Sequence, residues 1–171
     1  MDLRGGAAHL EAVLARFRVD RLVRHSTEAG GTWRGGGAGE FPTMDPFEYE
    51  EEIKFLDLGV PAIVYQQRAW SPDDQELLHL ETGLRRSDDD GVLAVTIALP
   101  RVAEVSEGWI EDGRVELAST SVSRAKGGAG LAAVRRKYEL REDTISYDIA
   151  MATDGVPTLT THLIGALRRV A

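Results

Sequence analysis

The segment that most constrains the fold of this chain is Gly-Thr-Trp-Arg-Gly-Gly-Gly-Ala-Gly-Glu-Phe-Pro-Thr, at residues 31–43. Its bulky and charged residues are untypical of a flexible linker, and it lacks the Gly-Lys-Ser/Thr ending of a phosphate loop. Glycine within a strand marks a bulge, a sharp bend or a close approach of two backbones. We therefore interpret the segment as the first strand of a small closed barrel, anchored by Trp33. A glycine-rich surface loop beside a core tryptophan is the alternative.

Further along the chain, short segments rich in β-branched and aromatic residues are separated by turn residues. The predicted strands span 31–37, 47–57, 61–70, 77–86, 92–99, 102–110, 114–121, 132–141, 144–152 and 159–169. Ten strands at hairpin spacing predict an antiparallel meander, and such a sheet avoids two open edges by closing into an up-and-down barrel. A barrel with this number of strands is wide enough to hold a ligand.

The 171 residues suit one domain with a core of its own. One amphipathic helix is expected before the barrel, because apolar residues recur at helical spacing within 8–19. The expected organisation is a lead-in with this helix at 1–24, followed by an all-β barrel domain at 25–171.

Charge and composition exclude several classes of partner. The formal charge of −8 argues against nucleic acid, whose phosphates are neutralised by basic side chains. No apolar run approaches the ~20 residues that span a bilayer, and the first residues lack the order of a secretory signal. The absence of cysteine excludes disulfides and thiolate ligands, and agrees with the cytoplasm as the expected location.

The histidines are the remaining candidates for metal chemistry. There are four, at positions 9, 25, 79 and 162, and none has the spacing of a zinc site made by protein alone. Because alternate residues of a strand share a face, His162 is expected on the same face of the last predicted strand as Ile164 and Ala166. An imidazole on an apolar face suits a single ligand for a large flat cofactor. The alternative is a core histidine bonded to a backbone carbonyl. His79 also lies in a predicted strand and reaches the interior or the rim, where a structural role is favoured.

Two motifs at opposite ends of the chain together resemble the nitrobindin family of haem-binding β-barrels. The first is Gly31-x-Trp33-x-Gly35-x-Gly37 followed by Gly39-Glu-Phe-Pro-Thr43, and the second is Thr161-His-Leu-x-x-x-Leu-Arg-Arg169. Intervening segments resemble the family in the same order, among them His79-Leu-Glu-Thr-Gly83 and Glu104-Val-Ser-Glu-Gly108. The resemblance covers about residues 25–170.

The resemblance implies a ten-stranded barrel, similar to fatty-acid-binding proteins, that holds ferric haem b at an open end. It also implies that His162 is the iron ligand, on which activity depends. Members of the family bind nitric oxide and isomerise peroxynitrite to nitrate. Thr43 and Lys126 match family residues near the haem. The Gly127-Gly-Ala-Gly130 loop after Lys126 is longer and richer in glycine than its family counterpart. In related barrels an arginine of the last strand covers the tryptophan, so Arg168 or Arg169 is expected over Trp33.

Other functions remain open from sequence alone. The same barrel without iron would serve as an intracellular carrier of a fatty acid or another apolar molecule, with Arg136 on the inner face to hold a carboxylate. An inward imidazole at position 162 favours the haem protein, because such a carrier has no need of it. A barrel that has lost its cofactor is a third reading, and a homodimer through the helix or an exposed strand face also remains open.

Overall fold

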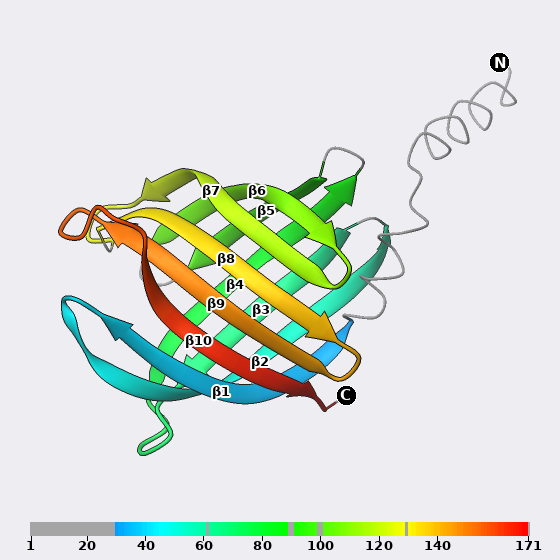
Figure 1. Ribbon diagram of the computed structural model, residues 1–171, viewed down its shortest axis with the longest axis horizontal. Helices are drawn as coiled ribbons and strands as arrows, with labels where there is room; N and C mark the ends of the chain where they lie inside the picture. Colours follow the sequence, from blue (N-terminus) through cyan, green and yellow to red (C-terminus); the bar gives the residue numbers. More distant parts are fainter. Residues whose placement is uncertain (1–29, 61, 89–90, 99–100, 129, 171) are drawn as a thin grey trace, which may run out of the picture.

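The computed structural model describes residues 30–60, 62–88, 91–98, 101–128 and 130–170, which form one closed antiparallel barrel (Figure 1). Its strands are β1 (Gly31–Phe41), β2 (Met44–Val60), β3 (Ala62–Trp70), β4 (Leu77–Asp88), β5 (Gly91–Ala98), β6 (Val102–Glu111), β7 (Arg114–Arg124), β8 (Leu131–Arg141), β9 (Thr144–Thr153) and β10 (Thr160–Arg169). The predicted all-β barrel is confirmed. The helix expected at 8–19 lies outside the described residues, as does the expected domain boundary. The described residues include no helix able to cross a bilayer.

Each strand pairs with the next one along the chain, and β1 pairs with β10 to close the barrel. Because consecutive strands run in opposite directions, the connections after β1, β3, β5, β7 and β9 lie at one end, which we call the His162 end. The first residues of β1 and the last residues of β10 lie at the opposite end, the Trp33 end, beside the turn from β8 to β9 (Figure 1).

The glycines of β1 allow its backbone to approach both neighbouring strands closely. A Cβ atom on Gly37 would lie 2.1 Å from the carbonyl oxygen of Ile164 and 2.5 Å from the hydroxyl of Tyr49. Such contacts exclude any larger side chain. The strand runs on past the predicted end at residue 37, because Gly39 still pairs with Phe47 before the tight turn into β2. The glycine-rich segment is therefore a strand, as interpreted from sequence.

The Trp33 end is filled by the indole that anchors β1. Trp33 is 1% exposed and packs in the cluster that contains Ile53, Ile145 and Leu167. The guanidinium carbon of Arg169 lies 4.5 Å from the centre of the Trp33 ring, a distance suited to a cation–π contact. Of the two arginines expected from sequence, Arg169 thus covers the tryptophan, whereas Arg168 is exposed.

Candidate functional site

A hollow of about 230 Å³ lies at the His162 end of the barrel interior. Strands β2, β3, β4 and β10 supply its lining residues, which are Met44, Phe47, Tyr49, Gln67, Ala69, Leu78, His79, His162 and Leu163. Most of these side chains are apolar or aromatic, and the polar groups among them are few. Such a lining is typical of a site for an apolar ligand that is oriented by a small number of polar contacts.

A bulge places the imidazole of His162 beside this hollow. In the pairing of β10 with β9, Thr161 faces Ala150 and Leu163 faces Ile149, so His162 is the extra residue. The prediction that His162 shares an inward face with Ile164 and Ala166 is wrong, because Ile164 is 54% exposed. The side chains of β10 that face the barrel interior are those at the alternate positions, between Ile164 and its even-numbered neighbours. Strict alternation fails here because the bulge shifts the side-chain parity of β10 at this position.

The ring of His162 is held by a backbone acceptor and by aromatic neighbours. Its Nδ1 lies 3.1 Å from the carbonyl oxygen of Glu40, and the N–H donates to that carbonyl. Phe41 packs edge-on at 5.6 Å between ring centres, and Phe47 lies at 6.0 Å. Burial lowers the pKa of His162, against the raising effect of the Glu40 carbonyl. A neutral ring that donates through Nδ1 keeps the lone pair of Nε2, which is the form that binds a metal.

His162 also lines a second hollow of about 500 Å³. The other residues lining it are Ala38, Gly39, Glu40, Pro46, Phe47, Glu48, Thr161 and Ile164. They come from the β1–β2 hairpin and the start of β10. The imidazole therefore borders space on the β1–β2 side as well as toward the barrel interior.

His79 lies on the same 230 Å³ hollow as His162, a position that sequence left undecided. Its Nε2 is 3.3 Å from Oε2 of Glu81, the next inward residue on β4. A carboxylate partner of this kind fixes the orientation of an imidazole ring. The hollow thus contains two oriented imidazoles, one held by a carbonyl and the other by a carboxylate.

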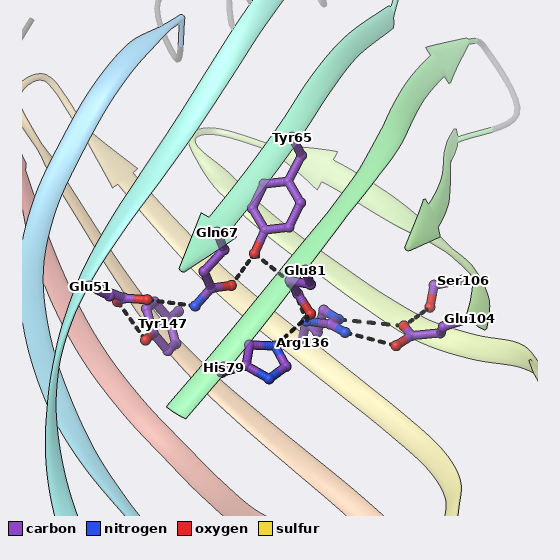
Figure 2. A network of polar contacts seen from close by, with 9 residues as sticks. All are labelled: Glu51, Tyr65, Gln67, His79, Glu81, Glu104, Ser106, Arg136 and Tyr147. Carbon is purple, nitrogen blue, oxygen red and sulfur yellow. Dashed lines mark hydrogen bonds and ion pairs between the residues drawn. The ribbon is translucent and has the colours of Figure 1, made fainter. Parts of the chain in front are cut away.

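Below the hollow, a buried arginine links two carboxylates from different strands (Figure 2). Nη1 of Arg136 lies 3.1 Å from Oε1 of Glu81, and Nη2 lies 2.8 Å from Oε2 of Glu104. Burial alone would raise the pKa of Glu81, but Arg136, His79 and Tyr65 together hold it well below its usual range. The charge of Arg136 is therefore already balanced, which leaves it poorly suited to binding the carboxylate of a fatty acid.

A second branch of the network centres on Glu51, which is fully buried. Its two oxygens accept hydrogen bonds of 2.5 Å from the hydroxyl of Tyr147 and from Nε2 of Gln67 (Figure 2). Burial raises the pKa of Glu51 to about 7, although these two hydrogen bonds favour the charged form. Sequence reasoning missed Glu51, Glu81 and Glu104. The available signal was a charged residue at an inward position of a predicted strand.

We expect the substitution Glu51→Gln to stabilise the protein by about 3 kcal/mol at pH 8 and by less than about 1 kcal/mol at pH 5. A carboxyl whose pKa is raised from 4.5 to about 7 holds its proton more tightly in the folded state, so stability falls as pH rises through that window. The neutral amide avoids this loss. Urea unfolding at the two pH values measures the effect, with the exposed Glu48→Gln as control. Equal effects of Glu51→Gln at both pH values would contradict the assignment.

Thr43 and Lys126, the other two site residues expected from sequence, lie in connections at the His162 end. Thr43 is an exposed residue of the turn between β1 and β2. Lys126 is exposed in the loop after β7, where its carbonyl accepts a 2.6 Å hydrogen bond from Arg101. Neither residue is among those that line the two described hollows beside His162.

Comparison with known proteins agrees with this architecture. The sequence model of a family described as "THAP4-like, heme-binding beta-barrel domain" matches residues 28–169. A protein named peroxynitrite isomerase from Nocardia farcinica is 40% identical over 144 residues, covering 81% of this chain and 85% of the relative. One of the same name from Streptomyces griseus is 40% identical over 148 residues, covering 82% and 80%. The crystal structure of Rv2717c from M. tuberculosis superposes with a TM-score of 0.80 at 30% identity, covering 88% of this chain and 98% of that one.

Proposed function

Because the chain belongs to the nitrobindin family of haem-binding β-barrels, we propose that it isomerises peroxynitrite to nitrate on a ferric haem b bound by His162. The relatives named peroxynitrite isomerase support the reaction. The observation that carries the assignment to this chain is the geometry of His162. Its Nδ1 donates to the carbonyl of Glu40, and its Nε2 is left with a lone pair beside an apolar hollow.

The residues present suit a haem better than a free metal ion. Within the described residues, no group of three or more histidine or acidic side chains could hold a metal ion by itself. One imidazole with a fixed tautomer is sufficient for haem, whose porphyrin supplies the other ligands. Phe41 and Phe47 restrict the His162 ring, and Leu163 adds apolar lining. This donor set would hold a haem through the imidazole of His162, and the bound haem would offer its iron to a small ligand such as nitric oxide.

The bound haem would supply the iron at which the peroxynitrite oxygen–oxygen bond is rearranged. The chain's own contribution is attachment, orientation and exclusion of water by the apolar lining. We propose that Thr43 and Lys126 contact the edge of the porphyrin, with the Lys126 ammonium pairing with a propionate. The net charge of −8 opposes the approach of an anion, although this field is screened beyond ~8 Å at physiological salt. A cation at the His162 end would locally offset this repulsion of the anion.

The test is an absorption titration of the protein with ferric haem, followed by stopped-flow decay of peroxynitrite. We expect a Soret band typical of ferric haem bound by histidine, and faster decay with haem than without it. His162→Ala should lose this band, because the iron then has no protein ligand. His79→Ala serves as the matched control, since it removes an imidazole from the same hollow. An unchanged spectrum in His162→Ala would refute its role as ligand, and decay independent of haem would refute the activity.

A further inference from the structure

Two tyrosines from opposite parts of the chain touch through their hydroxyl groups beside the His162 hollow. The Oη atoms of Tyr49 on β2 and Tyr147 on β9 lie 2.6 Å apart, and both side chains are buried. Tyr49 lines the hollow, whereas Tyr147 lies behind it. A phenol at the wall of a site that handles reactive nitrogen species is therefore connected directly to a second phenol in the interior.

The direction of the hydrogen bonds follows from counting protons. Tyr147 has one phenolic proton, and it donates to Oε1 of Glu51 at 2.5 Å (Figure 2). In the contact between the two tyrosines the donor is therefore Tyr49, whose proton has a second acceptor in the carbonyl of Ile164 at 3.1 Å. The order Tyr49, Tyr147, Glu51 is a chain of donors that ends on a carboxyl group.

A phenol gives up an electron readily only when its proton can leave at the same time. Burial raises the pKa of Tyr49 and of Tyr147 well above the usual range, so neither ionises alone. Glu51 provides the acceptor because its carboxyl has a pKa of about 7 and is charged in a large fraction of molecules near neutral pH. Tyr65 also donates to a carboxylate, Glu81, at 2.6 Å. Glu81 is a much weaker base, because Arg136 and its other partners keep its pKa low.

We propose that Tyr49 is a site of one-electron oxidation and nitration, and that its phenolic proton passes through Tyr147 to Glu51. The proposal rests on the proposed function only for the source of the oxidant. The oxidant is nitrogen dioxide radical, which peroxynitrite releases when its oxygen–oxygen bond breaks homolytically. A radical that escapes into the hollow can reach Tyr49, which lines it.

One electron moves from the Tyr49 ring to nitrogen dioxide, which becomes nitrite. The Tyr49 proton moves to the Tyr147 oxygen while the Tyr147 proton moves to Oε1 of Glu51, leaving a phenoxyl radical and a neutral carboxylic acid. A second nitrogen dioxide then forms a carbon–nitrogen bond at the ring carbon next to the oxygen-bearing carbon. The hydrogen on that carbon shifts to the oxygen as a proton, which restores the phenol as 3-nitrotyrosine.

The proposal predicts that nitration is selective for one of the four tyrosines of the chain. Tyr65 and Tyr138 line neither hollow beside His162. The Tyr138 hydroxyl is buried without a hydrogen-bond partner within the described residues, so its proton has no acceptor there. Tyr138→Phe is therefore a matched control, which removes a buried hydroxyl that lies outside the chain of donors.

The experiment exposes the haem-free full-length protein to nitrogen dioxide generated by pulse radiolysis. The tyrosyl radical is followed by absorption, and 3-nitrotyrosine is located by mass spectrometry of peptides. We expect nitration mainly at Tyr49, and its loss in Tyr49→Phe. Radical formation should slow on the order of a hundredfold in Glu51→Gln, which removes the proton acceptor but keeps the carboxyl's shape. Tyr147→Phe should slow it similarly, and Tyr138→Phe should leave it unchanged.

Nitration distributed equally over the four tyrosines, or an unchanged rate in Glu51→Gln, would overturn the proposal. Because this experiment contains no haem, its outcome does not depend on whether the protein binds haem. A failure of the proposed isomerase activity can therefore be distinguished from a failure of the proposed tyrosine site. A second arm adds peroxynitrite to the haem-loaded protein. It should again place 3-nitrotyrosine at Tyr49, and its appearance only at other tyrosines would count against the proposal.

Discussion

Replacing Arg136 by Met is expected to lower the free energy of unfolding by about 3–5 kcal/mol at neutral pH. Arg136 is buried between Glu81 and Glu104, and its removal leaves two carboxylates inside the barrel without a countercharge. Ser106 and Tyr65 can still donate to them, but neither supplies positive charge. Urea unfolding followed by tryptophan fluorescence measures the loss.

The pH dependence of this loss identifies its cause. In the parent protein the pKa of Glu81 is depressed, so Glu81 contributes stability above about pH 4.5 that is lost as the pH falls further. In Arg136→Met the same carboxyl has a raised pKa, and stability is lost as the pH rises. The gap between the two proteins should therefore widen from pH 5 to pH 8. The control is Lys137→Met, whose exposed ammonium lies 3.9 Å from Glu116 and should contribute less than about 1 kcal/mol. A gap of constant size would show that lost packing, and not charge, is responsible.

Trp33→Ala is the second large effect, with an expected loss of about 3–5 kcal/mol. The indole is fully buried at the Trp33 end, and the adjacent strand segment, rich in glycine, has little side-chain volume with which to fill the space. Arg169 would also lose the ring beneath its guanidinium, a contact worth about 0.5–2 kcal/mol. The denaturation midpoint should fall, with little change in haem binding at the opposite end.

Trp109→Ala is the matched control for this substitution. Trp109 lies on β6 and is 46% exposed, so truncation of its indole removes few buried contacts. Its cost should stay below about 1 kcal/mol. Comparable losses in the two variants would show that the Trp33 end is less tightly packed than the structure indicates.

Local pattern was sufficient to predict the strands because alternation and turn chemistry are properties of adjacent residues. All ten predicted strands are present, and most bounds shift by a few residues. The largest difference is at the first hairpin, where β1 continues to Phe41 and β2 begins at Met44. Pro42 and Thr43, which follow the predicted first strand, form the tight turn of a longer hairpin.

The candidate site was predicted in part. The final-strand motif singled out His162, and the structure places it on the hollow. The predicted orientation of His162 was wrong, because strict alternation along the strand placed its side chain on the same face as Ile164, which points outward. A bulge depends on how β10 pairs with β9, and no pattern within β10 alone contains that information.

By itself, the amino-acid sequence determined the number and order of the strands, and it singled out Trp33 and His162 through motifs at the two ends of the chain. The strands follow from short-range steric and hydrophobic preferences, which act between residues close in the chain. Only the tertiary structure decided which charges meet inside. Glu81, Glu104 and Arg136 come from three different strands, and Tyr49 meets Tyr147 across 98 positions. Closure of the barrel and the register of each strand bring such groups within hydrogen-bonding distance, and the low dielectric of the interior then sets their protonation.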